Sequence, residues 1–143
     1  TYAGSWQVDD GPIWWPIPET YTGQEAAALL FGGNASDYVI STISNLVADI
    51  DHLTWVSTYG GACGGVNCGT KVAQDFEKST LGFYATEGDT SAYVRDWAEG
   101  SEFTNYAFRV SPVPLPAALP LLASGLAGLW LVSRRRQAGS AAA

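Results

Sequence analysis

The sequence lacks most of the residues on which enzyme chemistry relies. Its 143 residues include one histidine and two cysteines, and none is methionine. A Ser-His-Asp triad would need His52 with Asp49 or Asp51, but no Gly-x-Ser-x-Gly elbow is present to position the serine. The many acidic residues leave a glycosidase pair open, because such a pair is defined by its separation in space, although solvated surface acids are the simpler interpretation. We therefore predict that the protein is not an enzyme and holds no cofactor.

The absence of methionine bears on how the chain is processed. Translation begins with methionine, so a chain that starts at Thr1 indicates that a secretory signal peptide has been removed. A chain trimmed at this point for expression is the alternative. The first interpretation predicts an exported protein.

Basic residues are also scarce, and their distribution divides the chain. All fourteen acidic residues lie before Val110. Only four basic residues accompany them, which leaves this region near −10: Lys71, Lys78, Arg95 and Arg109. So acidic a region repels phosphates and has no basic stripe to offset the repulsion, which argues against nucleic acid as a partner. The C-terminal segment, in contrast, carries three arginines and no acid.

The two cysteines, Cys63 and Cys68, lie in a glycine-rich segment. Four flexible intervening residues let their Cβ atoms approach to the roughly 3.5–4.5 Å that a disulfide needs. Half of a zinc site is the alternative, but the sequence has no second cysteine pair and no histidine cluster. We therefore predict a disulfide between them and no metal bound there.

Pairs of acids at turn positions leave a structural calcium ion open. They are Asp49 with Asp51 and Glu87 with Asp89. Calcium takes hard oxygen ligands of this kind, but the EF-hand pattern is absent.

Residues 1–110 have the pattern of an antiparallel β domain. Thr22 and Glu25 form a capping box before an alanine- and leucine-rich run that Gly32 and Gly33 end, which predicts a short, mostly buried helix. Turn residues separate runs rich in Tyr, Trp, Val and Thr. These runs predict strands within residues 2–8, 38–44, 52–59, 72–76, 81–86, 92–97 and 103–110. Their spacing favours an antiparallel β-sandwich or jelly roll with one short helix.

Two adjacent tryptophans, Trp14 and Trp15, are the strongest candidates for a binding site. Prolines at positions 12, 16 and 18 exclude a strand or helix interior, so this segment is an edge or a loop. Paired indoles there suit a partner protein or a sugar ring, while packing in the core is the alternative. Three aromatic residues nearby in the sequence are predicted to extend such a patch: Tyr2, Trp6 and Tyr21.

The C-terminal segment has the length and charge of a membrane anchor. Eighteen uncharged residues from Leu115 to Val132 would span about 27 Å as a helix, close to a bilayer core of about 30 Å. We predict a proline-rich linker at residues 111–116, a membrane-spanning helix at 115–133 and a basic cytoplasmic tail at 134–143. Ser124 and Gly128 are four residues apart, a spacing that suits close contact with another helix, or else they face lipid.

The same segment carries a recognisable motif. It reads Val113-Pro114-Leu115-Pro116-Ala117, then an apolar span with Ser124-Gly125-Leu126, then Arg134-Arg135-Arg136. This order resembles the VPLPA variant of the PEP-CTERM sorting signal. The resemblance implies a Gram-negative bacterial protein that is exported and handled by an exosortase. Segments of residues 25–33, 36–42, 91–94 and 104–110 also resemble small uncharacterised PEP-CTERM proteins, a class associated with cell surfaces and extracellular polysaccharide. That resemblance implies no activity, cofactor or catalytic residue.

Two functions are compatible with these features. The first is a non-enzymatic, single-pass protein of the bacterial inner membrane, whose periplasmic domain docks as an accessory subunit on an integral-membrane complex of the photosynthetic or respiratory kind. The second is a cell-surface protein processed by an exosortase and associated with extracellular polysaccharide through glycan binding.

Overall fold

The structure is a computed structural model that describes residues 1–60, 69–76 and 78–110. The chain divides into two units, Thr1–Ser111 and Pro112–Ala143, and the described residues all belong to the first. The predicted disulfide between Cys63 and Cys68 lies outside the described residues, as do the predicted linker, membrane-spanning helix and basic tail. Among the helices of the described part, none is long and apolar enough to cross a membrane.

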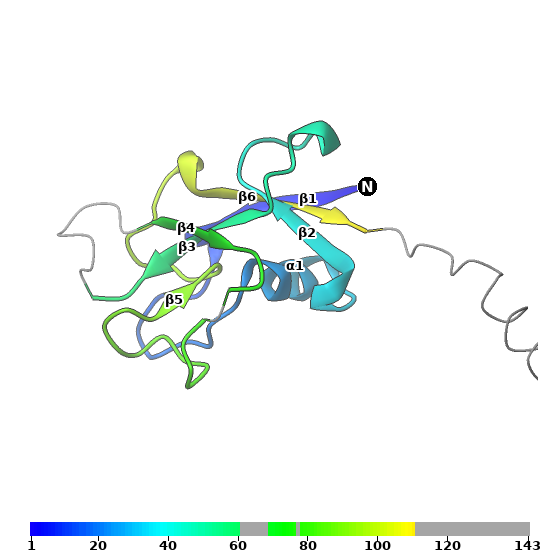
Figure 1. Ribbon diagram of the computed structural model, residues 1–143. Helices are drawn as coiled ribbons and strands as arrows, with labels where there is room; N and C mark the ends of the chain where they lie inside the picture. Colours follow the sequence, from blue (N-terminus) through cyan, green and yellow to red (C-terminus); the bar gives the residue numbers. More distant parts are fainter. Residues whose placement is uncertain (61–68, 77, 111–143) are drawn as a thin grey trace, which may run out of the picture. The chain divides into compact units, whose positions relative to one another are not determined.

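Two antiparallel three-stranded sheets form most of this unit (Figure 1). The first has the order β1-β6-β2, with bounds Tyr2–Gln7, Thr104–Arg109 and Tyr38–Ser41. The second has the order β4-β3-β5, with bounds Thr70–Ala73, Leu53–Thr58 and Thr90–Ser91. Four short 3-10 helices lie in the described connections: Val8–Asp10, Ala35–Asp37, Val47–Asp49 and Ser101–Phe103. The predicted β-rich domain is confirmed.

The single α-helix of the described residues, α1 (Gly23–Phe31), is the one that the capping box predicts. The Glu25 backbone N–H donates to Thr22 Oγ1 at 3.2 Å, and the Thr22 N–H donates to Glu25 Oε2 at 2.9 Å. Gly32 follows at φ 77°, a conformation that suits glycine and ends the helix. The helix is less buried than predicted, because Leu29 and Leu30 are exposed while only part of one face is covered.

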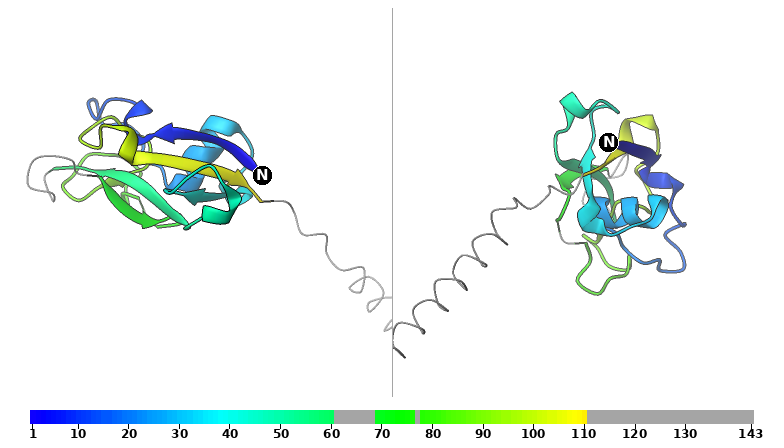
Figure 2. Two further views of the ribbon diagram at one scale, coloured as in Figure 1. Left: turned by 90° about the horizontal axis from the view of Figure 1, so that it is seen from above. Right: turned by 90° about the vertical axis from the view of Figure 1, so that its right-hand side faces the viewer.

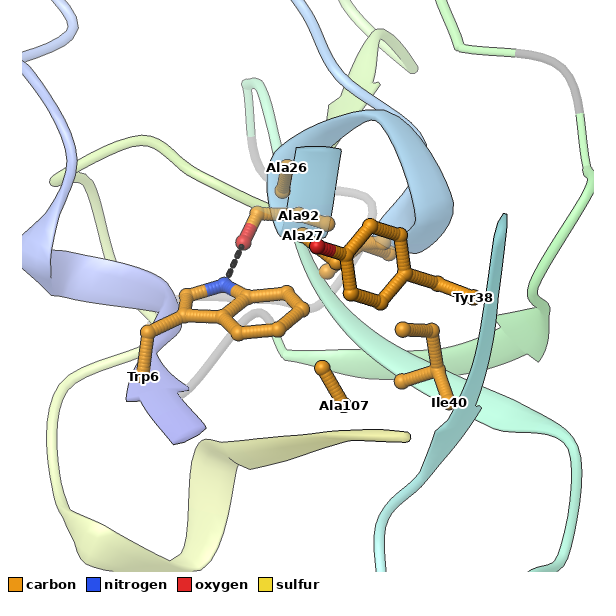
Figure 3. Close-up of a cluster of buried hydrophobic side chains, with 8 residues drawn as sticks. Trp6, Ala26, Ala27, Tyr38, Ile40, Ala92 and Ala107 are labelled. Carbon is orange, nitrogen blue, oxygen red and sulfur yellow. Dashed lines mark hydrogen bonds between the residues drawn. The ribbon is translucent and has the colours of Figure 1, made fainter. Parts of the chain in front are cut away.

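The core lies between α1 and strands of both sheets. The helix lies on one side of the strands, as Figures 1 and 2 show, and it contacts β2, β3 and β6. The main buried cluster is shown in Figure 3, and it contains Trp6, Ala26, Ala27, Tyr38, Ile40, Val56, Ala92 and Ala107. Two alanines on the helix allow its backbone to approach the large aromatic side chains of the strands closely.

Two predicted strands do not form. Residues 81–86 and 92–97 make only isolated bridges, between Glu19 and Phe83 and between Ile13 and Arg95. Their partner segment contains prolines at positions 12, 16 and 18, which have no N–H to donate to a ladder. Each bridge therefore has only two backbone hydrogen bonds, and the chain continues in turns. Asp96 and Trp97, at the end of the second segment, line a cleft with Trp14.

Candidate functional site

An open cleft of about 210 Å³, called here the aromatic cleft, lies where three loop segments meet. It is lined by Trp14, Tyr59, Gly60, Asp96 and Trp97. Three of these five residues are aromatic and one is a carboxylate, which is the composition of a ligand site with few polar groups. The volume is below the roughly 300–1,000 Å³ of pockets for drug-sized ligands, so the cleft suits a single small ring.

Backbone hydrogen bonds hold Trp14 beside residues 96 and 97. The Arg95 N–H donates to the Pro12 carbonyl at 2.8 Å, and the Trp14 N–H donates to the Arg95 carbonyl at 3.0 Å. Two further hydrogen bonds join the same segments: the Val94 N–H donates to the Val8 carbonyl and Arg95 Nε donates to the Asp9 carbonyl, each at 3.0 Å. These bonds bring two tryptophans from distant parts of the sequence to one cleft.

Tyr59 enters the cleft from the end of β3. Its N–H donates to the Asp89 carbonyl at 2.8 Å, and its carbonyl accepts from the Gly88 N–H at 3.0 Å. Its ring contacts Trp14 edge-on, with centroids 6.1 Å apart. Gly60 follows at φ 77°, where a side chain would be strained and would come within 3.3 Å of Glu87. Because Gly60 has no side chain, this side of the cleft stays open to a ligand.

Asp96 supplies the carboxylate of the cleft, and Tyr84 orients it. The Tyr84 hydroxyl donates to Asp96 Oδ2 at 2.8 Å, and the Tyr84 ring packs edge-on against Tyr59 with centroids 5.2 Å apart. Burial raises the pKa of Asp96, and the hydrogen bond from Tyr84 offsets part of that rise. Burial also raises the pKa of Tyr84, so this hydroxyl remains a donor at neutral pH.

The tryptophans of the cleft are exposed to solvent. The exposed fractions are 40% for Trp14, 62% for Trp15 and 53% for Trp97. The alternative that Trp14 and Trp15 pack in the core is therefore wrong. Trp15 lies beside the cleft rather than in its lining, with its ring centroid 6.2 Å from that of Trp14.

Trp6 does not belong to this surface. It is 4% exposed, and its indole N–H donates to the Ala92 carbonyl at 2.8 Å inside the core (Figure 3). The prediction that Trp6 extends an exposed aromatic patch is wrong, because the side chain points from β1 toward α1. Tyr2, on the same strand, contacts Phe108 instead.

Tyr21 lies in a second hollow, separate from the lining of the aromatic cleft. That hollow also contains Glu25 and Lys78. The Tyr21 ring faces Tyr93 and lies 5.7 Å from Lys78 Nζ, while its hydroxyl donates to Glu19 Oε2 at 2.9 Å. The structure therefore brings together Trp14 and Trp15 of the predicted set, but not Trp6 or Tyr21.

Four residues of the site were missed by sequence reasoning. Tyr59, Tyr84 and Trp97 fall within predicted strands, and Asp96 is one acid among fourteen. An acid and a tryptophan adjacent at positions 96 and 97, just before the turn at residues 99–101, are the one local signal that points to this site.

Three of the four acids proposed for calcium, Asp49, Asp51 and Asp89, accept hydrogen bonds within the protein. Asp51 accepts hydrogen bonds from the Thr42 N–H and hydroxyl and from the Leu53 N–H. Burial acts to raise the pKa of Asp51, but these hydrogen bonds prevail and lower it. Asp49 accepts from the Ser44 hydroxyl at 2.7 Å. Within residues 1–60, 69–76 and 78–110, no group of three or more His, Cys, Asp and Glu side chains could hold a metal ion.

His52 lies exposed at the start of β3, with φ 56°. In the described part of the chain, no hydrogen bond joins its side chain to Asp49 or Asp51. The triad geometry is therefore not present among these residues.

Comparison of the chain with protein-family models, with curated proteins and with solved structures gives no match. The lining of the aromatic cleft contains one carboxylate, whereas most glycosidases use two. Its exposed indoles and its one carboxylate suit binding of a ring with both apolar and polar faces.

Proposed function

We propose that this chain is a non-enzymatic saccharide-binding protein of the bacterial envelope and that the aromatic cleft is its binding site. The observation that carries the proposal is the exposure of Trp14 and Trp97 around a cleft that also contains Asp96. A large apolar side chain such as an indole is usually buried, so its exposure beside a carboxylate indicates a binding site. The exposed ring gains stabilising contact when a ligand covers it.

A sugar ring meets both features of the cleft. Its C–H faces are apolar and pack on an aromatic face, while its hydroxyl groups donate to a carboxylate. Asp96 keeps acceptor capacity beyond the bond from Tyr84, because a carboxylate offers about four lone-pair sites. A partner that is polar throughout would leave the tryptophans uncovered.

The remaining features of the proposal come from the sequence. Residues 113–136 resemble a sorting signal of the PEP-CTERM type, which supports export, insertion of one helix in the inner membrane and handling by an exosortase. In this proposal the two sheets form a small β-sandwich outside the cytoplasm, fixed to the membrane or, after cleavage of the tail, at the cell surface. The class resemblance to proteins of extracellular polysaccharide favours the same ligand.

The test is a binding screen of the full chain in mild detergent against a panel of bacterial polysaccharides and defined oligosaccharides. We expect at least one saccharide to bind and Trp14→Ala to weaken that binding. Phe76→Ala is the control, because Phe76 is also exposed but lies outside the lining of the cleft. Binding that Trp14→Ala and Phe76→Ala change equally, or no binding to any saccharide, would refute the proposal.

A second function has support of its own. Five exposed apolar side chains lie on the two segments that pair near the cleft: Ile13, Trp15, Ile17, Leu81 and Phe83. Exposed apolar groups of this kind favour a protein partner, as expected for an accessory subunit of an integral-membrane complex. Native purification in mild detergent separates the two functions: a stoichiometric complex that Trp15→Ala dissociates favours docking, and an isolated chain argues against it.

A further inference from the structure

The aromatic cleft carries a negative charge, and no basic side chain within residues 1–110 balances it. Asp96 lines the cleft, and Glu87 lies beside Gly60 at its edge. Neither acid has an ion pair within the described residues, where the one salt bridge joins Lys78 to Glu25. The cleft is thus an aromatic site with an unpaired acid at its wall.

The four basic side chains that precede the C-terminal segment are all engaged elsewhere. Lys78 pairs with Glu25, and Lys71 Nζ lies 4.9 Å from the centroid of the Trp55 ring. The other two are arginines that donate to backbone carbonyls: Arg95 to Asp9 at 3.0 Å, and Arg109 to Phe31 at 2.6 Å. None of these contacts involves Asp96.

The combination of aromatic faces with an unpaired carboxylate is the chemistry that recognises an organic cation. The face of an aromatic ring is negative, so an ammonium group within about 6 Å of a ring centroid is attracted to it. A carboxylate accepts a charge-assisted hydrogen bond from the same group. Trp14, Tyr59 and Trp97 supply the rings, and Asp96 supplies the counter-charge.

We propose that the saccharide bound in the aromatic cleft carries a protonated amine, as in a 2-amino-2-deoxy sugar, and that Asp96 is the residue that selects it. This inference rests on the proposed function and specifies its ligand. The ring packs on Trp14 and Trp97 while the ammonium group donates to Asp96. Uronic acids and sulfated sugars are disfavoured, because Asp96 in the cleft, Glu87 beside Gly60 and the net charge near −10 of residues 1–110 repel them.

The experiment compares three oligosaccharides of equal length by calorimetry with the full chain in mild detergent. They are the tetramer of chitosan, which carries free amines, the tetramer of chitin, in which the amines are acetylated, and cellotetraose, which has none. Measurement at about pH 6 keeps most amines protonated. We expect the chitosan tetramer to bind about tenfold more tightly than either neutral tetramer, because only it makes the charged contacts.

Two variants locate the selectivity. Asp96→Asn keeps an acceptor for Tyr84 but removes the charge, and it should bring the chitosan tetramer to the affinity of the neutral ones. Glu102→Gln removes one charge at an exposed site outside the cleft and should leave the preference unchanged. Selectivity lost equally in both variants would mean that the net charge of the domain, rather than Asp96, attracts the amine, and it would overturn the inference.

The two proposals fail in different ways. Equal affinity for the three tetramers in the natural chain overturns the amine preference, and it does so without any variant. The saccharide-binding proposal still stands in that case, provided that Trp14→Ala weakens all three. Absence of binding to these tetramers and to the wider panel overturns both.

Discussion

Replacing Trp97 with alanine should weaken saccharide binding by roughly five- to tenfold. An aromatic side chain of roughly 150–250 Å² that is about half exposed leaves roughly 80–130 Å² for a ligand to cover. Its exposed fraction is 53%. Covering all of this area at about 25 cal/mol per Å² would contribute about 2–3 kcal/mol. A sugar ring covers only one face of the indole, so the contact contributes about half of this, about 1–1.5 kcal/mol. A loss of that size raises Kd by roughly five- to tenfold.

The same substitution also affects folding, and the control must match that effect. The buried half of Trp97 packs against the domain, so alanine should lower the free energy of unfolding by about 1–2 kcal/mol. Phe76→Ala is a suitable match, because Phe76 is 56% exposed and lies outside the lining of the cleft. Both variants should lose a similar amount of stability in thermal unfolding followed by circular dichroism.

The assay is calorimetric titration of each folded variant with the saccharide that binds the natural chain. Trp97→Ala should bind the saccharide with a larger Kd, and Phe76→Ala should bind it with the Kd of the natural chain. If Trp97→Ala binds as tightly as the natural chain, the indole contributes no contact area and the aromatic cleft is not the binding site. If both variants weaken binding equally, the effect is one of folding and the assignment fails as well.

Three further substitutions test the physical account of the fold and of the charged groups. Trp6→Phe leaves the Ala92 carbonyl without its indole donor, so the free energy of unfolding in urea should fall by about 1–3 kcal/mol. Glu25→Gln should make the melting temperature fall less steeply in acid. Burial acts to raise the pKa of Glu25, but the hydrogen bonds from Lys78 and Thr22 prevail and lower it. The ionised Glu25 therefore stabilises the fold above its usual pKa, and this stabilisation is lost as pH falls through the lower pKa of the folded state. A melting curve of Glu25→Gln as steep in acid as that of the natural chain would refute this. Asp96→Asn should melt at a higher temperature than the natural chain at neutral pH, because burial raises the pKa of Asp96 and the charged form costs stability as pH rises through that window. The difference should vanish in acid, where Asp96 is protonated in both states, and a difference that persists there would contradict the explanation.

Local features of the fold were predictable because they depend on residues close together in the chain. The capping box of α1 requires Thr22 and Glu25 three residues apart, and both hydrogen bonds form. Strands β1, β2, β3 and β6 lie within predicted segments, since their alternation and β-branched residues are local signals. The failure at residues 81–86 and 92–97 has a non-local cause, because the prolines that stop their pairing are about 65 to 80 residues earlier.

The sequence by itself determined that residues 1–110 form an acidic β-rich domain with one capped helix, and that Trp14 and Trp15 lie on a proline-limited loop. Composition and short-range spacing are enough for these conclusions. Only the tertiary structure decided which tryptophans face solvent. Trp6 is buried because β1 pairs with β6 and turns that side chain toward α1, whereas Trp14 stays exposed because its segment pairs only briefly with Arg95. It also decided that Trp14, Tyr59, Asp96 and Trp97 share one cleft, since backbone hydrogen bonds between distant segments, and no pattern along the chain, bring them together.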